Sequence, residues 1–468
     1  MFVEGVAMLL ALAVSLIYNE SDTLGFILSS GLNMSVGASI IWLTRNVSQD
    51  IGKREGFIIV ALVWIVFSLL GSLPYIFTGS IPNYTDAFFE TMSGFTTTGS
   101  SILNDVESLP HGILFWRSLT QWLGGMGMIV LSLAILPVFG IGGMQLYIAE
   151  VPGPTPDKIS PRIRQTAATL WVIYLVFTVA QILLLWLGKM PLFDAVCHSF
   201  TTMATGGFST KQASIAFWPS PYIQYVVVLF MFIAGTNFTL SYFAIRGKFN
   251  HLLKDEEFKF YLFIILVFTL LIFTGLLIST QAGVENAFRD ALFQVVSIIT
   301  TTGFATTDYL LWKPVLIALI FSAFFFGGSA GSTGGGIKIM RIVLLLKNGY
   351  YELKRMVHPN AVIPLKFNKH SVDSKIVTNV LAFFVLYFMI FGVSTVLFML
   401  FEPNLETSMG AVATSLGNIG PGLGSVGPAE TFAHIHPAGK WFLSFLMLLG
   451  RLELFTILVL FSPTFWKQ

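Results

Sequence analysis

Charged residues are scarce in this sequence. Asp, Glu, Lys and Arg together make up 11% of it, whereas 55% is hydrophobic and the mean hydropathy is +0.78. This composition predicts an integral membrane protein and excludes an ordinary soluble domain. The net charge of +2 says little about partners and gives no indication of a nucleic acid.

Cysteine is almost absent as well. The single cysteine, Cys197, excludes an internal disulfide and is expected to serve in helix packing. The first residues, MFVEGVAMLLALAVSLIY, lack a basic region and a cleavage site, which predicts a retained helix and not a signal peptide. The histidines show no metal-site spacing, and no nucleophile, base and acid occur together. We therefore expect neither an enzyme nor a covalently bound cofactor.

Long apolar segments dominate the chain. Ten are expected to span the bilayer, near residues 2–18, 24–44, 57–78, 112–139, 165–187, 221–245, 258–280, 312–346, 376–401 and 438–461. The loops near 45–56, 157–164, 246–259 and 341–375 hold 17 Lys and Arg residues, against 5 on the opposite side. The positive-inside rule places the first set of loops, and both termini, in the cytoplasm.

A Thr- and Gly-rich motif recurs between these segments. In three copies an Asp is followed 13 residues later by a glycine, from Asp86, Asp194 and Asp290 to Gly99, Gly207 and Gly303. A weaker fourth copy runs from Glu406 through VATSLGNIG to Gly420. The glycines are separated by 108, 96 and 117 residues, so the chain repeats one unit four times.

Each copy lies between two long apolar helices. Its own apolar part is too short to cross a bilayer and is typical of a re-entrant segment. Non-helical backbone at membrane depth persists only where it is buried in protein or lines a water-filled path. Four such loops around one axis would present backbone carbonyls to a dehydrated cation, as in a potassium-selective filter. An ordinary helix C-cap explains one TTTG motif, but not four copies in register.

Six motifs carry a resemblance to a known family. They are GFTTTGSS (94–101), TTMATGGFST (201–210), TTTGFATTD (300–308), GGSAGSTGGGIK (327–338), IGPG (419–422) and GRLELFT (450–456). Over essentially its whole length the sequence resembles the membrane subunit of the Trk potassium-uptake system, in the Trk/Ktr/HKT superfamily of cation transporters. The resemblance implies an all-α membrane fold of four pseudo-symmetric helix, pore loop, helix repeats around one pore. These repeats would occupy 57–139, 165–245, 258–346 and 376–461, after an N-terminal two-helix extension at 1–45.

The filter is expected at equivalent positions of the four repeats. These are Thr97, Thr98 and Gly99; Thr205, Gly206 and Gly207; Thr301, Thr302 and Gly303; and Asn418, Ile419 and Gly420. In the family, a serine in place of the first filter glycine accompanies sodium permeation, so the intact Gly99 favours potassium as the transported ion. The fourth loop departs most from the pattern, because Asn418 and Ile419 replace threonine.

The segment 312–346 is longer than a bilayer requires, and six glycines between 327 and 336 interrupt it. This pattern predicts a loop inside the membrane that obstructs the pore below the filter, and the resemblance implies the same gate. The alternatives are a Gly-rich packing interface or a P-loop-like nucleotide site, although Ile337 separates the last glycine from the lysine. The expected gate residues are Gly327, Gly328, Gly331, Gly334, Gly335, Gly336, Lys338 and Arg451.

Two arginines interrupt apolar helices, where a charge is costly. Arg451 is expected mid-helix, with Glu453 on another helix face. Either Arg451 points inward, where it bonds carbonyls of the gate loop or sits in the cavity as the resemblance implies, or it forms a buried structural ion pair. Arg117 is expected to support the filter from behind, and the glycines of 124–127 to permit close helix packing.

Acidic residues are frequent on the expected outer side, where they either raise the local cation concentration or keep the loops soluble. The aspartates that open the pore helices are also expected to act as N-caps. The outer acids are Asp86, Asp105, Glu107, Asp194, Glu285, Asp290, Asp308, Glu402, Glu406 and Glu430.

These features predict a channel-like potassium pore in a bacterial inner membrane. The basic stretch 347–375 is either a positive-inside signal alone or a docking surface. The resemblance implies a homodimer and a cytosolic ring of nucleotide-binding regulatory subunits. One alternative function is a proton- or sodium-coupled symporter with its substrate at the broken helix 327–336. Another is a membrane scaffold without transport.

Overall fold

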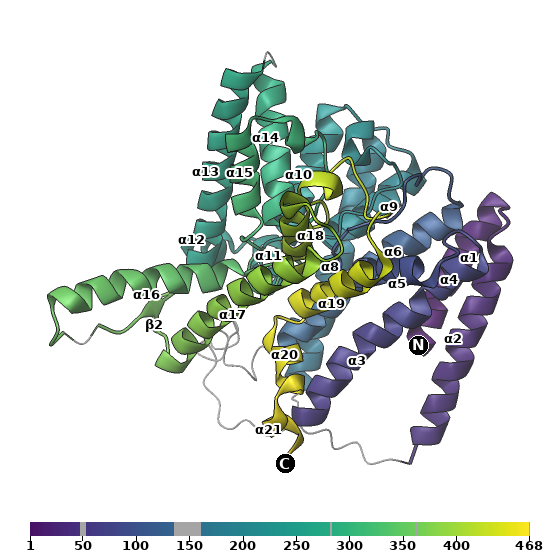
Figure 1. Cartoon of the computed structure of the whole chain (residues 1–468), viewed down its shortest axis with the longest axis horizontal. Helices are drawn as coiled ribbons and strands as arrows, with labels where there is room; N and C mark the ends of the chain where they lie inside the picture. The colour runs from purple at the N-terminus through teal and green to yellow at the C-terminus, as the bar shows by residue number, and fades with distance from the viewer. Residues whose placement is uncertain (47–52, 135–160, 281–282, 362, 468) are drawn as a thin grey trace.

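The computed structural model describes residues 1–46, 53–134, 161–280, 283–361 and 363–467. These residues form an assembly of helices with one short hairpin, in which β1 (Lys366–Phe367) pairs antiparallel with β2 (His370–Ser371). The all-α fold predicted from the sequence is confirmed (Figure 1).

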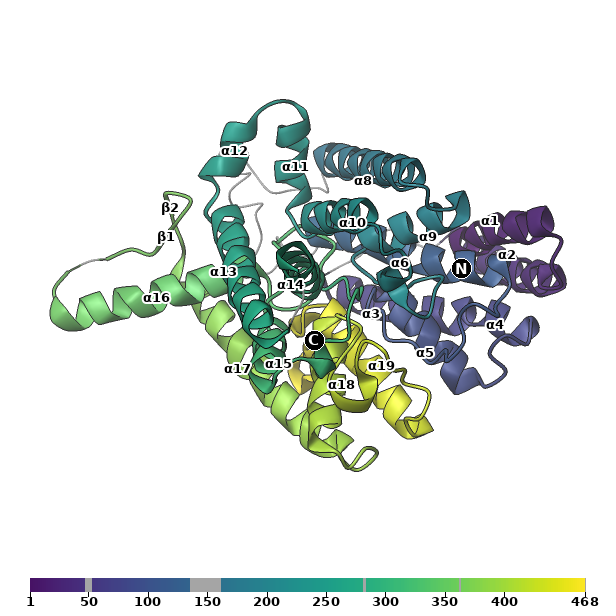
Figure 2. The same cartoon turned by 90° about the horizontal axis from the view of Figure 1, so that it is seen from above.

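Two helices precede the repeats. The helices α1 (Phe2–Tyr18) and α2 (Thr23–Thr44) pack along each other, and together they lie at one edge of the molecule (Figure 2). A carboxylate oxygen of Glu20, between them, accepts a hydrogen bond from the backbone N–H of His111 at 2.6 Å. The ring of Tyr18 stacks on the His111 ring, with centroids 3.9 Å apart. The extension therefore docks on the start of α6, the last helix of the first repeat.

Four groups of helices follow in sequence order and surround a common centre in Figure 2. The first contains α3 (Lys53–Gly71), α4 (Leu73–Phe77), α5 (Tyr84–Phe95) and α6 (His111–Ala134). The second contains α8 (Pro161–Leu187), α9 (Leu192–Met203), α10 (Pro221–Ala234) and α11 (Phe238–Ile245). The third contains α12 (Phe249–Lys254), α13 (Glu256–Ser279), α14 (Val284–Ile299), α15 (Pro314–Ala323) and α16 (Ile339–Val357). The fourth contains α17 (Ser374–Phe398), α18 (Leu405–Gly417), α19 (Pro437–Arg451), α20 (Phe455–Leu458) and α21 (Pro463–Trp466).

The helix lengths and composition are those of a multi-pass membrane protein. Within the described residues, five helices are long and apolar enough to cross a bilayer, or seven if each of two bent pairs counts as one span. Helix α1 has 17 residues and α15 has 10, so both fall below that length. Residues 135–139 of the expected segment 112–139 lie outside the described part of the chain.

Two expected spans, 221–245 and 438–461, are not continuous helices, which corrects the sequence prediction, whereas the break in 312–346 was expected. Between α10 and α11 the chain turns by 112°, and after α19 it turns by 110°. The segment 312–346 is divided into α15 and α16 by the non-helical residues 324–338, and α16 continues to Val357. This helix and the hairpin beside it project away from the rest of the molecule (Figures 1 and 2).

The prediction that aspartates cap the pore helices is wrong. The N-caps of α5, α9, α14 and α18 are Asn83, Pro191, Gly283 and Asn404. Asp86 and Asp194 lie in the first turns instead, where a negative charge favours the helix dipole. Asp86 also accepts a hydrogen bond from Lys440 Nζ at 2.6 Å, which joins the first repeat to the fourth.

Candidate functional site

The short helices α5, α9, α14 and α18 all end in the same backbone motif. Residues Thr97, Thr205, Thr301 and Asn418 follow these helices with φ between 51° and 58°. In each case the next N–H bonds back to the carbonyl five residues earlier, as from Thr98 to Ser93 at 2.8 Å. This is the Schellman C-cap, in which the left-handed residue is usually glycine. A β-branched threonine there is a conformational outlier, and such strain clusters at functional sites.

Two residues further on, each loop places a glycine with positive φ: Gly99, Gly207, Gly303 and Gly420. A Cβ atom on Gly99 would lie 2.1 Å from the carbonyl oxygen of Gly206, in the second loop. On Gly207 it would lie 2.0 Å from the carbonyl oxygen of Thr302, in the third loop.

The third and fourth loops make the same close contacts between a glycine and a carbonyl of the next loop. A Cβ atom on Gly303 would lie 2.0 Å from the carbonyl oxygen of Ile419, in the fourth loop. On Gly420 it would lie 3.0 Å from that of Thr98, in the first. The four loops thus form a closed ring in sequence order, with backbone against backbone. The structure therefore brings together all four sets of expected filter residues.

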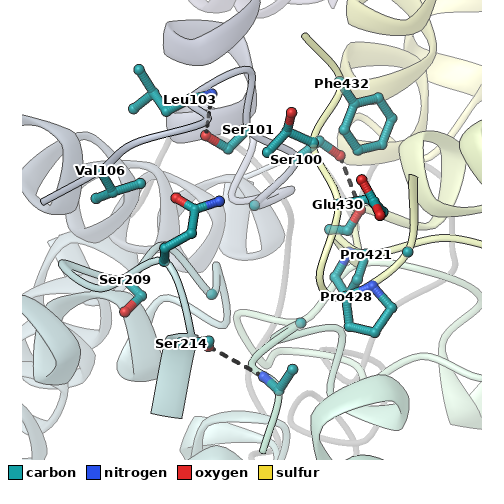
Figure 3. Close-up of a pocket in the computed structure, with 18 of the residues that line it drawn as sticks. Ser100, Ser101, Leu103, Val106, Ser209, Ser214, Pro421, Pro428, Glu430 and Phe432 are labelled. Atoms are coloured by element: carbon teal, nitrogen blue, oxygen red, sulfur yellow. Dashed lines mark hydrogen bonds between the residues drawn. The ribbon is translucent and has the colours of Figure 1, made fainter. Parts of the chain in front are cut away.

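A cavity of about 90 Å³ opens on one side of this ring (Figure 3). All four glycines line it, and three of them, Gly99, Gly207 and Gly303, are only half-buried. Ser209 and Pro421 lie on opposite sides of it in this view, and the exposed Glu430 belongs to its lining. Among the lining residues, Lys211 is paired with Glu107 at 3.5 Å.

A buried ion pair lies behind the ring. Arg117 in α6 and Glu90 in α5 are 2.6 Å apart, and both side chains are almost fully enclosed. The two Glu90 oxygens also accept hydrogen bonds from Ser101 Oγ and the N–H of Ile102, each at 2.9 Å. Arg117 Nη1 donates to the Ser209 carbonyl at 2.7 Å. One ion pair therefore connects the first of these short helices with the exits of two loops, and Arg117 also belongs to the lining of the cavity.

Two side-chain amides tie the loops to neighbouring helices. Gln121 Nε2 in α6 donates to the Gly206 carbonyl at 2.7 Å, and its Oε1 accepts from the N–H of Phe208 at 3.1 Å. Asn418 Nδ2 donates to Thr98 Oγ1 and to the Met447 carbonyl, both at 2.9 Å. The fourth loop, which departs from the threonine pattern, uses its asparagine to reach the first.

The glycine-rich residues 327–338 lie against the helix ends of three repeats. Thr333 Oγ1 donates to the carbonyl of Met203, the last residue of α9, at 2.9 Å. The N–H of Gly335 donates to Thr301 Oγ1 at 2.6 Å. A Cβ on Gly335 would lie 2.6 Å from the carbonyl oxygen of Gly417, the last residue of α18. The loop is therefore a folded segment held by threonine hydroxyls and close backbone contacts, and nearly all of it is buried.

Arg451 joins this loop to the first repeat. Its Nη1 donates to the Thr333 carbonyl at 2.8 Å and its Nη2 to the Gly124 carbonyl at 3.3 Å. Lys338 Nζ also donates into the loop, to the Gly334 carbonyl. Of the two alternatives open for Arg451, the contacts favour the one in which it bonds loop carbonyls.

The expected mid-helix position of Arg451 is corrected, because Arg451 is the last residue of α19. The next residues, Glu453 and Leu454, have φ of 57° and 58°, and the N–H of Phe455 bonds to the Glu453 carbonyl at 2.7 Å. Such a γ-turn is rare and strained. Glu453 is not on another helix face but forms an ion pair with Arg341 of α16.

Several of these residues were not predicted. Glu90, Gln121 and Arg341 give no signal beyond a polar residue in an apolar segment or a basic loop. A buried carboxylate within a pore helix is costly unless it is paired, so Glu90 and Arg117 are the pair that this rule could have found.

Fold and site together define a multi-pass membrane protein whose four repeated short helices end on one shared ring. The sequence profile of the TrkH family, described as cation transport proteins, matches residues 25–468. The chain belongs to this family.

The chain aligns with its relatives over nearly its full length and nearly all of theirs. It is 44% identical to the Trk system potassium uptake protein TrkH of Salmonella typhimurium, over 98% of this chain and 96% of that protein. It is 34% identical to the Trk system potassium uptake protein TrkG of Escherichia coli K12, over 99% and 96%. The crystal structure of the potassium transporter TrkH from Vibrio parahaemolyticus superposes with a TM-score of 0.92 at 40% identity, covering 100% of this chain and 97% of that one. These are transport proteins, which confirms the expectation that the chain is not an enzyme.

Proposed function

We propose that this chain is the membrane pore subunit of a potassium uptake system, and that potassium crosses the bilayer through the ring of four loops. The observation that carries the proposal is the ring itself, in which each glycine has a backbone carbonyl of the next loop against it. Backbone carbonyls that replace the hydration shell of an ion are the means of potassium selection in membrane pores. The names of the relatives support potassium as the transported ion.

Electrostatics support a cation in this position. The four short helices α5, α9, α14 and α18 direct their C-terminal ends toward the ring, and a helix C-terminus carries a partial negative charge. On the other side, the cavity is lined by the four glycines and Glu430, and its two cations, Arg117 and Lys211, are each paired with a carboxylate. A potassium ion therefore meets favourable partial charges before and after the ring.

The loop 327–338 acts as the gate in this proposal. It lies directly beneath the ends of three pore helices, and Arg451 extends its contacts to the first repeat. The loop is attached by hydrogen bonds and by the packing of Ala330 and Ile337 in the core, so its release requires both to be broken. Its movement would open the path without altering the ring.

The charge distribution and one exposed helix face support a location and partners for the protein. The protein would lie in a bacterial inner membrane with both termini in the cytoplasm, as the distribution of Lys and Arg indicates. The projecting helix α16 exposes apolar side chains at Leu346, Tyr350, Leu353 and Val357, which share one face. This face supports contacts with other proteins, and we propose a second copy of the chain and a cytosolic nucleotide-binding regulatory subunit as the partners.

Rubidium flux tests the proposal. Purified protein in vesicles loaded with potassium is expected to take up rubidium in the absence of any proton or sodium gradient, and external potassium should compete better than sodium. Uptake that requires a proton or sodium gradient would instead favour the coupled symporter. No uptake under any condition, also from a variant whose gate loop is deleted, would exclude transport.

A further inference from the structure

A carboxylate outside the ring binds the gate loop at a different residue from Arg451. Glu257 lies in the first turn of α13 and is only 5% exposed. Its Oε1 accepts hydrogen bonds from the N–H of Ala330 at 2.7 Å and from the N–H of Met340 at 3.0 Å. Ala330 belongs to the loop, and Met340 belongs to the first turn of α16. A single oxygen atom therefore connects the loop, the helix after it, and α13.

The contact provides a hydrogen-bond acceptor for the first turn of α16. The first N–H groups of a helix have no partner within the helix, and the N-cap of α16, Lys338, provides no side-chain bond. The acceptor comes from α13 instead, so the Glu257 side chain supplies the cap that Lys338 does not. Because one oxygen accepts from both Ala330 and Met340, the loop and the start of α16 share a single anchor.

The start of α13 is itself held in place. Asp255 Oδ1 caps the helix by accepting from the N–H of Phe258 at 2.7 Å. Asn368, in the hairpin that follows α16, donates to Asp255 Oδ2 at 2.7 Å and accepts from the N–H of Glu256 at 2.8 Å. Both the beginning of α16 and the segment after its end are thus attached to the same point, so α16 cannot move away from α13 without breaking these bonds.

We infer that Glu257 is a positioning residue that keeps the loop 327–338 in its obstructing place by fastening it to the first turn of α16. The inference rests on the proposed role of the loop as a gate. Arg451 and Glu257 bind different parts of the loop, a carbonyl at Thr333 and an amide at Ala330. A pull on α16 from the cytoplasmic side therefore acts on the Glu257 contact first.

Replacement of Glu257 tests this inference. In vesicles without any cytosolic partner, Glu257→Ala is expected to raise basal rubidium flux by about tenfold, because two hydrogen bonds are lost from the closed state alone. The preference for rubidium over sodium should not change, since the ring is untouched. Glu257→Gln keeps an acceptor oxygen and should give a smaller rise. Glu352→Ala is the control: this acid pairs with Arg355 of the same helix, α16, so its loss leaves the contacts between α13 and α16 in place, and flux should stay at the wild-type level.

Thiol accessibility provides a readout that does not depend on transport. In a Cys197→Ser background, a cysteine placed at the buried Ser332 should react with a small maleimide several-fold faster when Glu257 is replaced by alanine. An unchanged reaction rate in a folded Glu257→Ala protein would overturn the inference, whether or not rubidium crosses the membrane. Faster labelling without any flux would leave Glu257 as the anchor of the loop and refute the pore instead.

Discussion

The ring of glycines predicts that adding one small side chain impairs selectivity. At Gly303 a Cβ atom would lie 2.0 Å from the carbonyl oxygen of Ile419, whereas ordinary contacts begin at 3.4 Å. In Gly303→Ser the third and fourth loops must therefore separate by about 1.4 Å along this contact. A carbonyl displaced that far no longer contributes equally to an ion site, and we expect the preference for rubidium over sodium to fall by at least tenfold, which is about 1.4 kcal/mol.

The positive φ of Gly303 adds a conformational free-energy cost to any substitution there. This cost must be separated from the effect of the close contact with Ile419. A residue with a Cβ atom costs roughly 1–2 kcal/mol in such a conformation. Gly79 has φ of 73°, is exposed, and has no atom within 4 Å of its Cβ position. Gly79→Ser therefore carries the backbone cost without the contact, and it is the matched control.

Paired rubidium and sodium flux into vesicles measures the effect. Wild type and Gly79→Ser should show the same preference for rubidium, and Gly303→Ser should lose it while eluting as the same folded species from a sizing column. A Gly303→Ser protein that keeps the wild-type ratio would refute the reasoning, because the ring would then not select the ion.

Three further changes test other parts of the structure. Arg451→Ala removes the donor to the Thr333 carbonyl and should raise basal rubidium flux several-fold; a folded variant with wild-type flux would contradict its role on the gate. Deletion of 328–335 should give a leaky protein that still prefers rubidium, since Gly327 and Gly336 already lie in contact and can be joined; loss of all flux from the folded protein would favour the symporter. Glu90→Gln leaves Arg117 buried without its charge partner, at a cost of about 3–5 kcal/mol, and should lower the midpoint of thermal unfolding by several degrees; an unchanged midpoint would show that the pair does not support the fold.

The repeated architecture was predictable because it depends on local signals. A short apolar helix that ends in threonine and glycine indicates a left-handed turn wherever it occurs, and four copies at similar spacing indicate a ring. The six glycines of 327–336 likewise predicted a break, because so many glycines do not sustain a helix.

The other breaks were not predictable from local signals. After Arg451 the chain reads Leu452, Glu453 and Leu454, which favour helix, yet two of these residues adopt positive φ. The ion pair of Glu453 with Arg341, more than 100 residues away in the chain, contributes to holding this turn. Glu257 was missed for a similar reason. An acid in the first turn of a helix is expected for that helix alone, whereas this one serves the start of another.

The location of the transported ion within the protein tests the central claim most directly. Crystals grown in rubidium, with diffraction collected at the rubidium absorption edge, would reveal the ion by its anomalous signal. Our account predicts peaks on the axis of the ring, between Gly99, Gly207, Gly303 and Gly420. Peaks within the loop 327–338 and none in the ring would contradict it, because the ion would then bind at the broken helix as in a coupled carrier.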